Sequence, residues 1–166
     1  MKSLILYFSR AAENYFGGVL KYIEKGNTEV VAEKLAVLTD GDLFKIEPKV
    51  PYSDVYNICI EQAKQDQRSN ARPEVATMPA DMAQYDTVFV LFPNYWGSMS
   101  MHMFTVLEQL DLIGKTIRPI CTHEGSRMGN SERDLKKICI GAAVEPGLAI
   151  CGSNVYECEK TLKKWL

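Results

Sequence analysis

Three short polar segments hold the residues whose types could do chemistry. The first begins with Ser9 and Arg10, directly after an apolar run, and ends with Asn27 and Thr28, where an amphipathic stretch begins. If that stretch is a helix, its unpaired backbone N–H groups and its dipole favour an anion such as a phosphate. The Ser9 and Thr28 hydroxyls and the Asn27 amide would add neutral donors. The alternative is that Asn27 only caps the helix, and Glu29 in the first turn opposes an extra anion.

The second segment, Pro93-Asn94-Tyr95-Trp96-Gly97, follows the most strongly apolar run of the chain. Pro93 ends that run, and two large aromatic residues stand where solvent should begin. A flat apolar ligand would explain Tyr95 and Trp96 at this place, because stacking favours planar partners. The alternative is that both rings fold back and cover the core.

The third segment, Thr122-His123-Glu124-Gly125-Ser126, also follows an apolar run. Its glycine lets the backbone approach a ligand closely, and its polar groups can meet the edge of a heterocycle. Taken alone, the segment is more simply explained as an ordinary polar turn before a helix. A single site becomes the better interpretation only if the fold brings all three segments to one edge.

The elements that must position these segments alternate in type along the chain. Apolar runs predict five strands, at residues 4–8, 42–46, 87–92, 116–122 and 147–151. Amphipathic stretches predict five helices, at residues 28–38, 56–68, 101–110, 130–139 and 156–166. This alternation predicts one α/β domain over residues 1–166, a parallel sheet with helices on both faces. Ligands of such sheets bind beyond the carboxyl ends of the strands, where the three segments lie. Pro119 is a difficulty for a central strand, because it lacks a hydrogen-bond donor.

Composition excludes several classes of function. The net charge of -2, with scattered basic residues, argues against nucleic acid and against an anionic membrane surface as partners. The apolar run at residues 4–8 is too short for a signal peptide or a membrane span. Five cysteines without a C-x-x-C pair predict reduced thiols in a cytoplasmic protein. Two histidines far apart in sequence make a histidine-based metal site improbable.

Motifs in all three segments resemble the flavodoxin family. Tyr7-Phe8-Ser9 followed by Gly26-Asn27-Thr28-Glu29 resembles its phosphate-loop signature, with a stretch inserted between the two halves. The 92–97 and 121–126 segments resemble its two loops that contact the flavin ring. The resemblance implies FMN as cofactor and a three-layer sandwich with a five-stranded parallel sheet of order 2-1-3-4-5, an order that general principles associate with FMN at the switch point.

The resemblance also implies a role for each segment. Ser9, Asn27 and Thr28 would hold the phosphate of FMN, residues 93–97 would line the ribityl chain and the ring, and residues 122–126 would border the pyrimidine side. Residues 10–25 replace the usual compact phosphate loop, and Arg10 joins the candidate phosphate ligands. Gly17-Gly18 interrupts any helix there, which predicts a surface excursion beside the site. Two interpretations of its Tyr15, Phe16 and Tyr22 remain open: a wall of a pocket for a second ligand on the flavin, or a cover for the phosphate.

Two functions remain open. The first is an electron-transfer flavoprotein that meets a redox partner protein. The second is an FMN-dependent oxidoreductase that takes hydride from NAD(P)H and reduces a quinone or another small acceptor. A receiver-type signalling domain is excluded, because Ser9, Arg10 and Pro93 stand where it needs acidic residues. Neither a phosphate-binding P-loop motif nor a dinucleotide motif is present.

Overall fold

The computed structural model describes residues 2–166, and its strands form one main sheet and one separate hairpin. The main sheet contains β1 (Lys2–Tyr7), β4 (Asp42–Lys45), β5 (Tyr85–Pro93), β6 (Thr116–His123), β7 (Ala143–Val144) and β8 (Leu148–Cys151). The hairpin contains β2 (Ala12–Phe16) and β3 (Val19–Ile23). The helices are α1 (Asn27–Thr39), α2 (Tyr56–Arg68), α3 (Met101–Leu107), α4 (Ser131–Ile138) and α5 (Glu159–Trp165). Two 3-10 turns, η1 (Met82–Gln84) and η2 (Gly152–Glu157), complete the elements.

The main sheet is parallel and has the order β4-β1-β5-β6, with β7 and β8 sharing the outer side of β6. The predicted order of five positions is therefore confirmed. The last position was expected to hold one strand, and it holds two short ones. The sequence analysis missed β7, because two residues are too few to show an apolar run.

The division between β7 and β8 explains how Pro119 fits into β6. The Ile117 carbonyl accepts a hydrogen bond from the Glu145 N–H on the outer side, whereas the Thr122 carbonyl accepts one from the Asn94 N–H on the β5 side. Successive residues of a strand alternate in this direction, so Pro119 faces outward with Ile117. On that side β7 pairs with residues 116–117 and β8 with residues 120–123. The missing N–H thus falls in the gap between the two strands.

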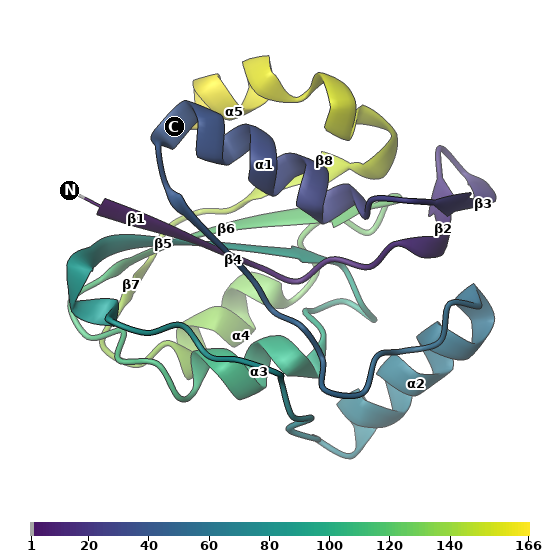
Figure 1. Cartoon of the computed structure of the whole chain (residues 1–166), viewed down its shortest axis with the longest axis horizontal. Coiled ribbons are helices and arrows are strands. Elements are labelled where there is room, and N and C mark those ends of the chain that lie inside the picture. Colours follow the sequence, from purple (N-terminus) through teal and green to yellow (C-terminus); the bar gives the residue numbers. More distant parts are fainter. Residues whose placement is uncertain (1) are drawn as a thin grey trace.

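Helices cover both faces of the sheet, as predicted (Figure 1). Along β1 and just beyond it, Leu4, Leu6 and Phe8 join the core cluster that includes residues of α3 and α4. Ile5 and Tyr7 join the opposite cluster, with residues of α1 and α5. This period of two is what a strand buried on both faces requires.

Helix ends differ from the predictions by a few residues. The third helix ends at Leu107 rather than 110, and the last begins at Glu159 rather than 156, because η2 precedes it. Asn27 does not cap α1: the cap position belongs to Gly26, with φ -62° and ψ 148°, and Asn27 is the first helical residue. Asn130 occupies the cap position of α4, but its side chain makes no capping hydrogen bond.

Residues 10–25 lie outside the main sheet, which agrees with the predicted surface excursion. The excursion is an antiparallel hairpin, and its strands pair with each other between Ala12–Ile23 and Phe16–Val19. In Figure 1 the hairpin and the start of α2 lie at the end toward which the parallel strands run. Among residues 2–166, no helix has both the length and the apolar content that crossing a membrane demands.

Candidate functional site

A cavity of about 340 Å³ opens at the carboxyl ends of β1, β5 and β6. All the residues singled out from the sequence line it except Gly125. Gly125 lies in an exposed turn, where its N–H donates to His123 Nδ1 at 2.9 Å. The fold thus brings the three polar segments to one place.

The start of α1 supplies one end of this cavity. The backbone N–H of Glu29 donates to Ser9 Oγ at 3.1 Å, and that of Val30 donates to the Gly26 carbonyl. Within residues 2–166, the backbone N–H groups of Asn27 and Thr28 have no protein acceptor. Two free donors on a positive helix end form a cradle for an anion.

Gly26 allows the end of β1 to approach the start of α1 closely. A Cβ atom on Gly26 would lie 2.1 Å from Ser9 Oγ and 2.7 Å from the Arg10 carbonyl oxygen. No side chain can be accommodated at such distances without moving the backbone of Arg10. The glycine of the motif is therefore a steric requirement of this junction.

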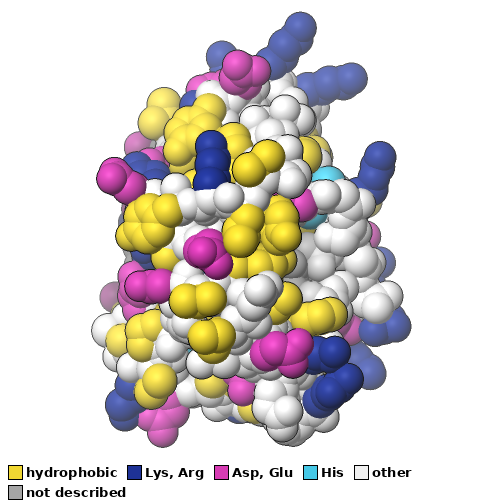
Figure 2. Space-filling view, turned by 90° about the vertical axis from the view of Figure 1, so that its right-hand side faces the viewer, with side chains coloured by type: hydrophobic (Ala, Val, Ile, Leu, Met, Phe, Trp, Pro, Cys, Tyr) yellow, Lys and Arg dark blue, Asp and Glu magenta, His cyan; other side chains and the backbone are white. Residues whose placement is uncertain are grey.

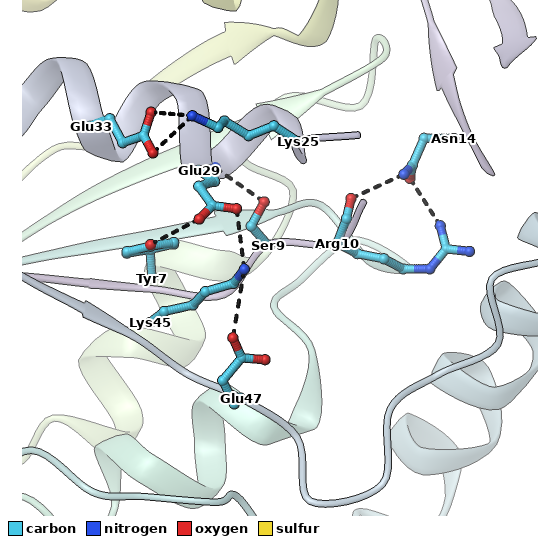
Figure 3. A network of polar contacts seen from close by, with 9 residues as sticks. All are labelled: Tyr7, Ser9, Arg10, Asn14, Lys25, Glu29, Glu33, Lys45 and Glu47. Carbon is cyan, nitrogen blue, oxygen red and sulfur yellow. Dashed lines mark hydrogen bonds and ion pairs between the residues drawn. The ribbon is translucent and has the colours of Figure 1, made fainter. Parts of the chain in front are cut away.

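Glu29 does not oppose an anion at the helix start as the sequence suggested. Its carboxylate accepts hydrogen bonds from Lys45 Nζ at 3.1 Å and from Tyr7 Oη at 3.4 Å (Figure 3). Burial, and then Glu29, raise the pKa of the Tyr7 hydroxyl, which stays protonated and can donate. Lys45 belongs to β4, the strand next to β1, and its ammonium group compensates the negative charge of Glu29 in the first turn of α1.

The hydroxyls of Thr28 and Thr122 join the first and third segments beneath the cavity. Their oxygens lie 2.8 Å apart, and both residues are almost fully buried. A hydroxyl donates one hydrogen, so when one threonine donates to the other, the acceptor keeps its own hydrogen free. The pair can therefore fasten two loops and still offer one donor to a ligand.

The Arg10 side chain anchors the hairpin. Its Nε and Nη2 donate to the Ser53 carbonyl at 3.2 and 2.7 Å, and Nη1 donates to the Glu13 carbonyl. Asn14 returns a hydrogen bond to the Arg10 carbonyl at 3.0 Å (Figure 3). Arg10 also lines the cavity, so its side chain holds two chain segments together and places a positive charge near the site.

In the second segment, Trp96 is fixed against α2. The indole N–H donates to the Ile60 carbonyl at 2.7 Å, and Lys64 Nζ lies 4.8 Å from the ring centroid. The Trp96 side chain remains 44% exposed and lines the cavity. A ring placed this way can be a wall for a flat ligand and is no part of the core, which rules out the alternative for this residue.

Tyr95 is placed deeper than Trp96. Its ring packs edge-on against Phe8 at 5.9 Å between centroids. Burial raises the pKa of its hydroxyl well above the usual value, and the neighbouring Cys59 thiol adds to the effect. Both interpretations proposed for the two aromatic residues therefore apply to Tyr95: its ring covers the core, and it also lines the cavity.

The third segment contributes a neutral imidazole. Burial, and then Arg127, lower the pKa of His123. Its Nδ1 accepts from Gly125, so the neutral ring carries its hydrogen on Nε2. Glu124 is directed toward the hairpin, where its Oε2 accepts the Gly18 N–H at 3.1 Å.

Apart from Tyr15 of the inserted stretch, one wall of the cavity was not predicted from the sequence. This wall comes from the hairpin and from α2, and its residues are Asn14, Tyr15, Ile23, Tyr56, Cys59, Ile60 and Ala63. A signal for part of it was present: Cys59, Ile60 and Ala63 share one face of the predicted helix 56–68. Nothing in the sequence indicated that this face, and not only the sheet, would meet a ligand.

Backbone strain is concentrated around the same cavity. Six non-glycine residues among residues 2–166 have positive φ, and three of them are Asp or Asn, which tolerate it. The other three are Ala12, Trp96 and Arg127, with φ of 72°, 52° and 55°. They lie in the hairpin, in the second segment and directly after the third segment, and such strain typically marks functional sites. Among residues 2–166, no group of three or more His, Cys, Asp or Glu side chains could hold a metal ion.

Fold and site together define an α/β protein with a ligand cavity at the switch point of a parallel sheet. Residues 18–166 match the family model described as Flavodoxin. The chain therefore belongs to the flavodoxin family, as its motifs indicated. No curated protein matches it.

Several solved structures are similar to this one over almost its whole length. A candidate flavoprotein from Bacteroides eggerthii DSM 20697 is 28% identical, with a TM-score of 0.80, over 99% of this chain and 95% of that one. A second, from Bacteroides uniformis ATCC 8492, is 25% identical, with a TM-score of 0.79, over 99% and 96%. A flavoprotein from Lactobacillus acidophilus NCFM in complex with FMN is 20% identical, with a TM-score of 0.72, over 99% and 97%. At that last identity the likeness concerns the fold.

Proposed function

We propose that the protein binds FMN in this cavity. The observation that carries the proposal is the joint presence of free N–H donors at the start of α1 and an aromatic wall in one cavity. Asn27 and Thr28, with Ser9 nearby, would hold the phosphate. Tyr95 and Trp96 would border the ring on one side. The family match, and the FMN complex of the Lactobacillus protein, support the same cofactor.

The residues present fit one phosphate group. The cradle is a single helix start, and no second phosphate-binding motif follows in the sequence. The compensation of Glu29 by Lys45, together with the guanidinium of Arg10, leaves the surroundings of the cradle suitable for a dianion. This arrangement favours FMN over FAD, whose pyrophosphate would need further donors.

We propose electron transfer as the function. FMN supplies one- and two-electron chemistry when it is bound. The chain would hold it, exclude water from the inner part of the ring and leave one edge accessible. Apolar side chains gather on the side of the molecule where the cavity opens (Figure 2). They come from the hairpin, α2, η2 and the second segment, and they include the exposed residues Tyr15, Val19, Tyr22, Ile58, Trp96 and Tyr156.

An exposed apolar surface of this kind is typical of a protein-binding site. We propose that a redox partner protein contacts it when electrons pass. All five cysteines are free thiols, and Cys59, Cys121, Cys139 and Cys158 are buried. Burial raises the pKa of Cys121 and Cys139 to about 12, so they are unreactive. Free thiols are typical of a reducing compartment, and we propose the cytoplasm.

Cofactor analysis and one anaerobic experiment test these proposals. The purified protein should be yellow, or take up FMN on mixing, and heat should release FMN. Recovery of FAD, or indifference to FMN, would contradict the cofactor. Anaerobic NADH or NADPH should leave the flavin oxidised, whereas a reduced flavodoxin reductase or dithionite should bleach it. Direct bleaching by a nicotinamide nucleotide would instead establish an NAD(P)H oxidoreductase with a small acceptor.

A further inference from the structure

The tip of the β2–β3 hairpin is held by few contacts. The Gly18 N–H donates to Glu124 Oε2 at 3.1 Å, which joins the hairpin turn to the third segment. Phe16 packs against Tyr156, at 6.4 Å between ring centroids, and against the edge of the core cluster beneath α1 and α5. A Cβ atom on Gly17 would lie 3.7 Å from the Cβ atom of Ser153, and one on Gly18 would meet nothing within 4 Å. The turn is therefore close to its neighbours without being packed into them.

The base of the hairpin is held more firmly. Besides the hydrogen bonds of Arg10, the Glu13 N–H donates to the Asp54 carbonyl at 3.2 Å, and Glu13 Oε1 accepts the Tyr56 N–H at 3.0 Å. The ring of Tyr15 packs edge-on against that of Tyr56 at 5.0 Å. The firm contacts lie beside α2, and the weak contact lies across the cavity.

Asn14, Tyr15 and Ile23 of the hairpin line the cavity between these two attachments. The hairpin makes no strand pairing with the main sheet, so it can move without breaking that sheet. Movement about the base would break the contacts of the turn and the packing of Phe16 against the core, and it would leave the base and the main sheet intact. Local openings of this kind take place in segments with few buried contacts.

The carboxylate of Glu124 lies at a junction of three segments. A Cβ atom on Gly152 would lie 2.6 Å from Glu124 Oε1 and 2.6 Å from Asn27 Nδ2. These two polar atoms are therefore close to each other, beside the start of α1. Glu124 thus joins the hairpin turn to the proposed phosphate end of the cavity.

We propose that the hairpin is a flap over the FMN site and that Glu124 is the positioning residue that keeps it closed. The inference rests on the proposed binding of FMN. The role of Glu124 is to accept a hydrogen bond from Gly18, which any side-chain oxygen at that place can do. Its charge is not required. The flap sets the rate at which FMN leaves, since most differences in affinity between related complexes are differences in dissociation rate.

The dissociation rate of FMN tests this role. The rate is measured by the change in the flavin absorption spectrum as FMN passes to excess apoflavodoxin of another species. A separate dilution without this acceptor gives a second record, the recovery of flavin fluorescence. Glu124→Ala should increase the rate roughly twofold to tenfold, the range for loss of one hydrogen bond. Glu124→Gln keeps an oxygen acceptor and should release FMN at the same rate as the parent protein. Glu157→Ala removes an exposed carboxylate from η2 and should also match the parent.

Hydrogen exchange of the apoprotein gives a measurement that needs no flavin. Glu124→Ala should speed exchange across residues 12–23 and leave β1, β5 and β6 protected. Equal rates in all variants, for FMN release and for exchange, would overturn the proposal. So would similar changes in Glu124→Gln and Glu124→Ala, because the charge and not the hydrogen bond would then be responsible.

A reversible crosslink tests the flap directly. The 3.7 Å between the added Gly17 Cβ and the Ser153 Cβ is within the range of a disulfide. A side chain at Gly17 is strained because φ is +64°, so the oxidised and reduced forms of one variant are compared with each other. Gly17→Cys with Ser153→Cys, in a Cys151→Ser background, should release FMN at least tenfold more slowly when oxidised and recover with dithiothreitol. Release unaffected by oxidation would overturn the flap. Failure of the parent chain to bind FMN at all would contradict the proposed function, a distinct outcome.

Discussion

The two ends of the cavity differ in the kind of structure that forms them. At the end beside α1, backbone donors, a required glycine and two buried threonines belong to the main sheet and its first helix. At the end beside α2, partly exposed aromatic rings come from a hairpin and a helix outside the sheet. The first arrangement follows from the fold. The second depends on contacts that are particular to this chain.

This difference implies a division of roles. A phosphate group is recognised by donors that any sequence can supply, provided that the backbone follows the same path. The surroundings of the ring are made by side chains, which can vary without changing the fold. Access and redox behaviour should therefore be set by the hairpin, α2 and the second segment, whereas retention of the phosphate should be set by the β1–α1 junction.

Gly26→Ala should have the largest effect. The added carbon would collide with Ser9 Oγ and with the backbone of Arg10, and overpacking of this kind costs about 3 kcal/mol. We expect a loss of FMN affinity of about a hundredfold, measured by fluorescence titration. Gly114→Ala adds a carbon that meets nothing within 4 Å, at a turn where φ is +75°. It should therefore lower stability through backbone strain and leave FMN affinity unchanged. Normal FMN binding by Gly26→Ala would show that the junction is not the cradle.

Acid should destabilise the region beneath the cavity through His102. This residue is 1% exposed, its ring stacks on Phe8, and burial lowers its pKa from 6.5 to about 4. The unfolded chain therefore binds a proton more readily than the folded one, so stability present above pH 6.5 is lost as the pH falls toward 4. The free energy of unfolding should fall by about 3 kcal/mol over that range.

Urea unfolding at several pH values measures this loss. His102→Phe removes the titrating group and should flatten the pH dependence by that amount, whatever its effect at neutral pH. An unchanged slope would mean that the imidazole is protonated equally in both states.

Thr28→Ala isolates the phosphate end. Loss of a hydrogen bond to a charged group costs about 1.5–3 kcal/mol, so FMN should bind about tenfold to a hundredfold more weakly. Riboflavin, which lacks the phosphate, should bind the parent and the variant about equally. Thr28→Ser keeps a hydroxyl and serves as the control. If the binding of riboflavin is weakened as much as the binding of FMN, the Thr28–Thr122 hydroxyl pair only supports the loops, and the phosphate binds elsewhere.

Trp96→Ala should have the smallest effect on affinity and act at the other end. Loss of one aromatic contact is worth about 0.5–1.5 kcal/mol beyond burial, a twofold to tenfold loss. The binding of FMN and the binding of riboflavin should be weakened by the same factor in this variant. Water would reach the ring, so the potential for the second electron should rise and flavin fluorescence should partly return. Trp96→Phe keeps a ring but loses the hydrogen bond to the Ile60 carbonyl. Its FMN affinity, potential and fluorescence should lie between those of the parent and those of Trp96→Ala. Unchanged potential and fluorescence would show that the indole does not border the ring.

Much of the site could be predicted because parallel strands end at one edge. Continuous apolar runs identified β1, β5 and β6, and the polar residues after each run were therefore expected together. The short β7 left no such signal, and neither did the position of Pro119 opposite a gap. Glu29 shows the same limit: its charge argued against a phosphate until Lys45, in another strand, was found beside it.

The sequence by itself determined the strands of the main sheet except β7, their order by resemblance, and the three loops of the site, because these follow from local apolar patterns and from motifs. The tertiary structure alone decided that the hairpin and α2 would close the cavity. Their attachments join Arg10 to Ser53, Glu13 to Tyr56 and Gly18 to Glu124. Such pairs are separated by about 40 to 100 residues and leave no periodic pattern, since a single hydrogen bond constrains neither the spacing nor the type of the residues between its ends.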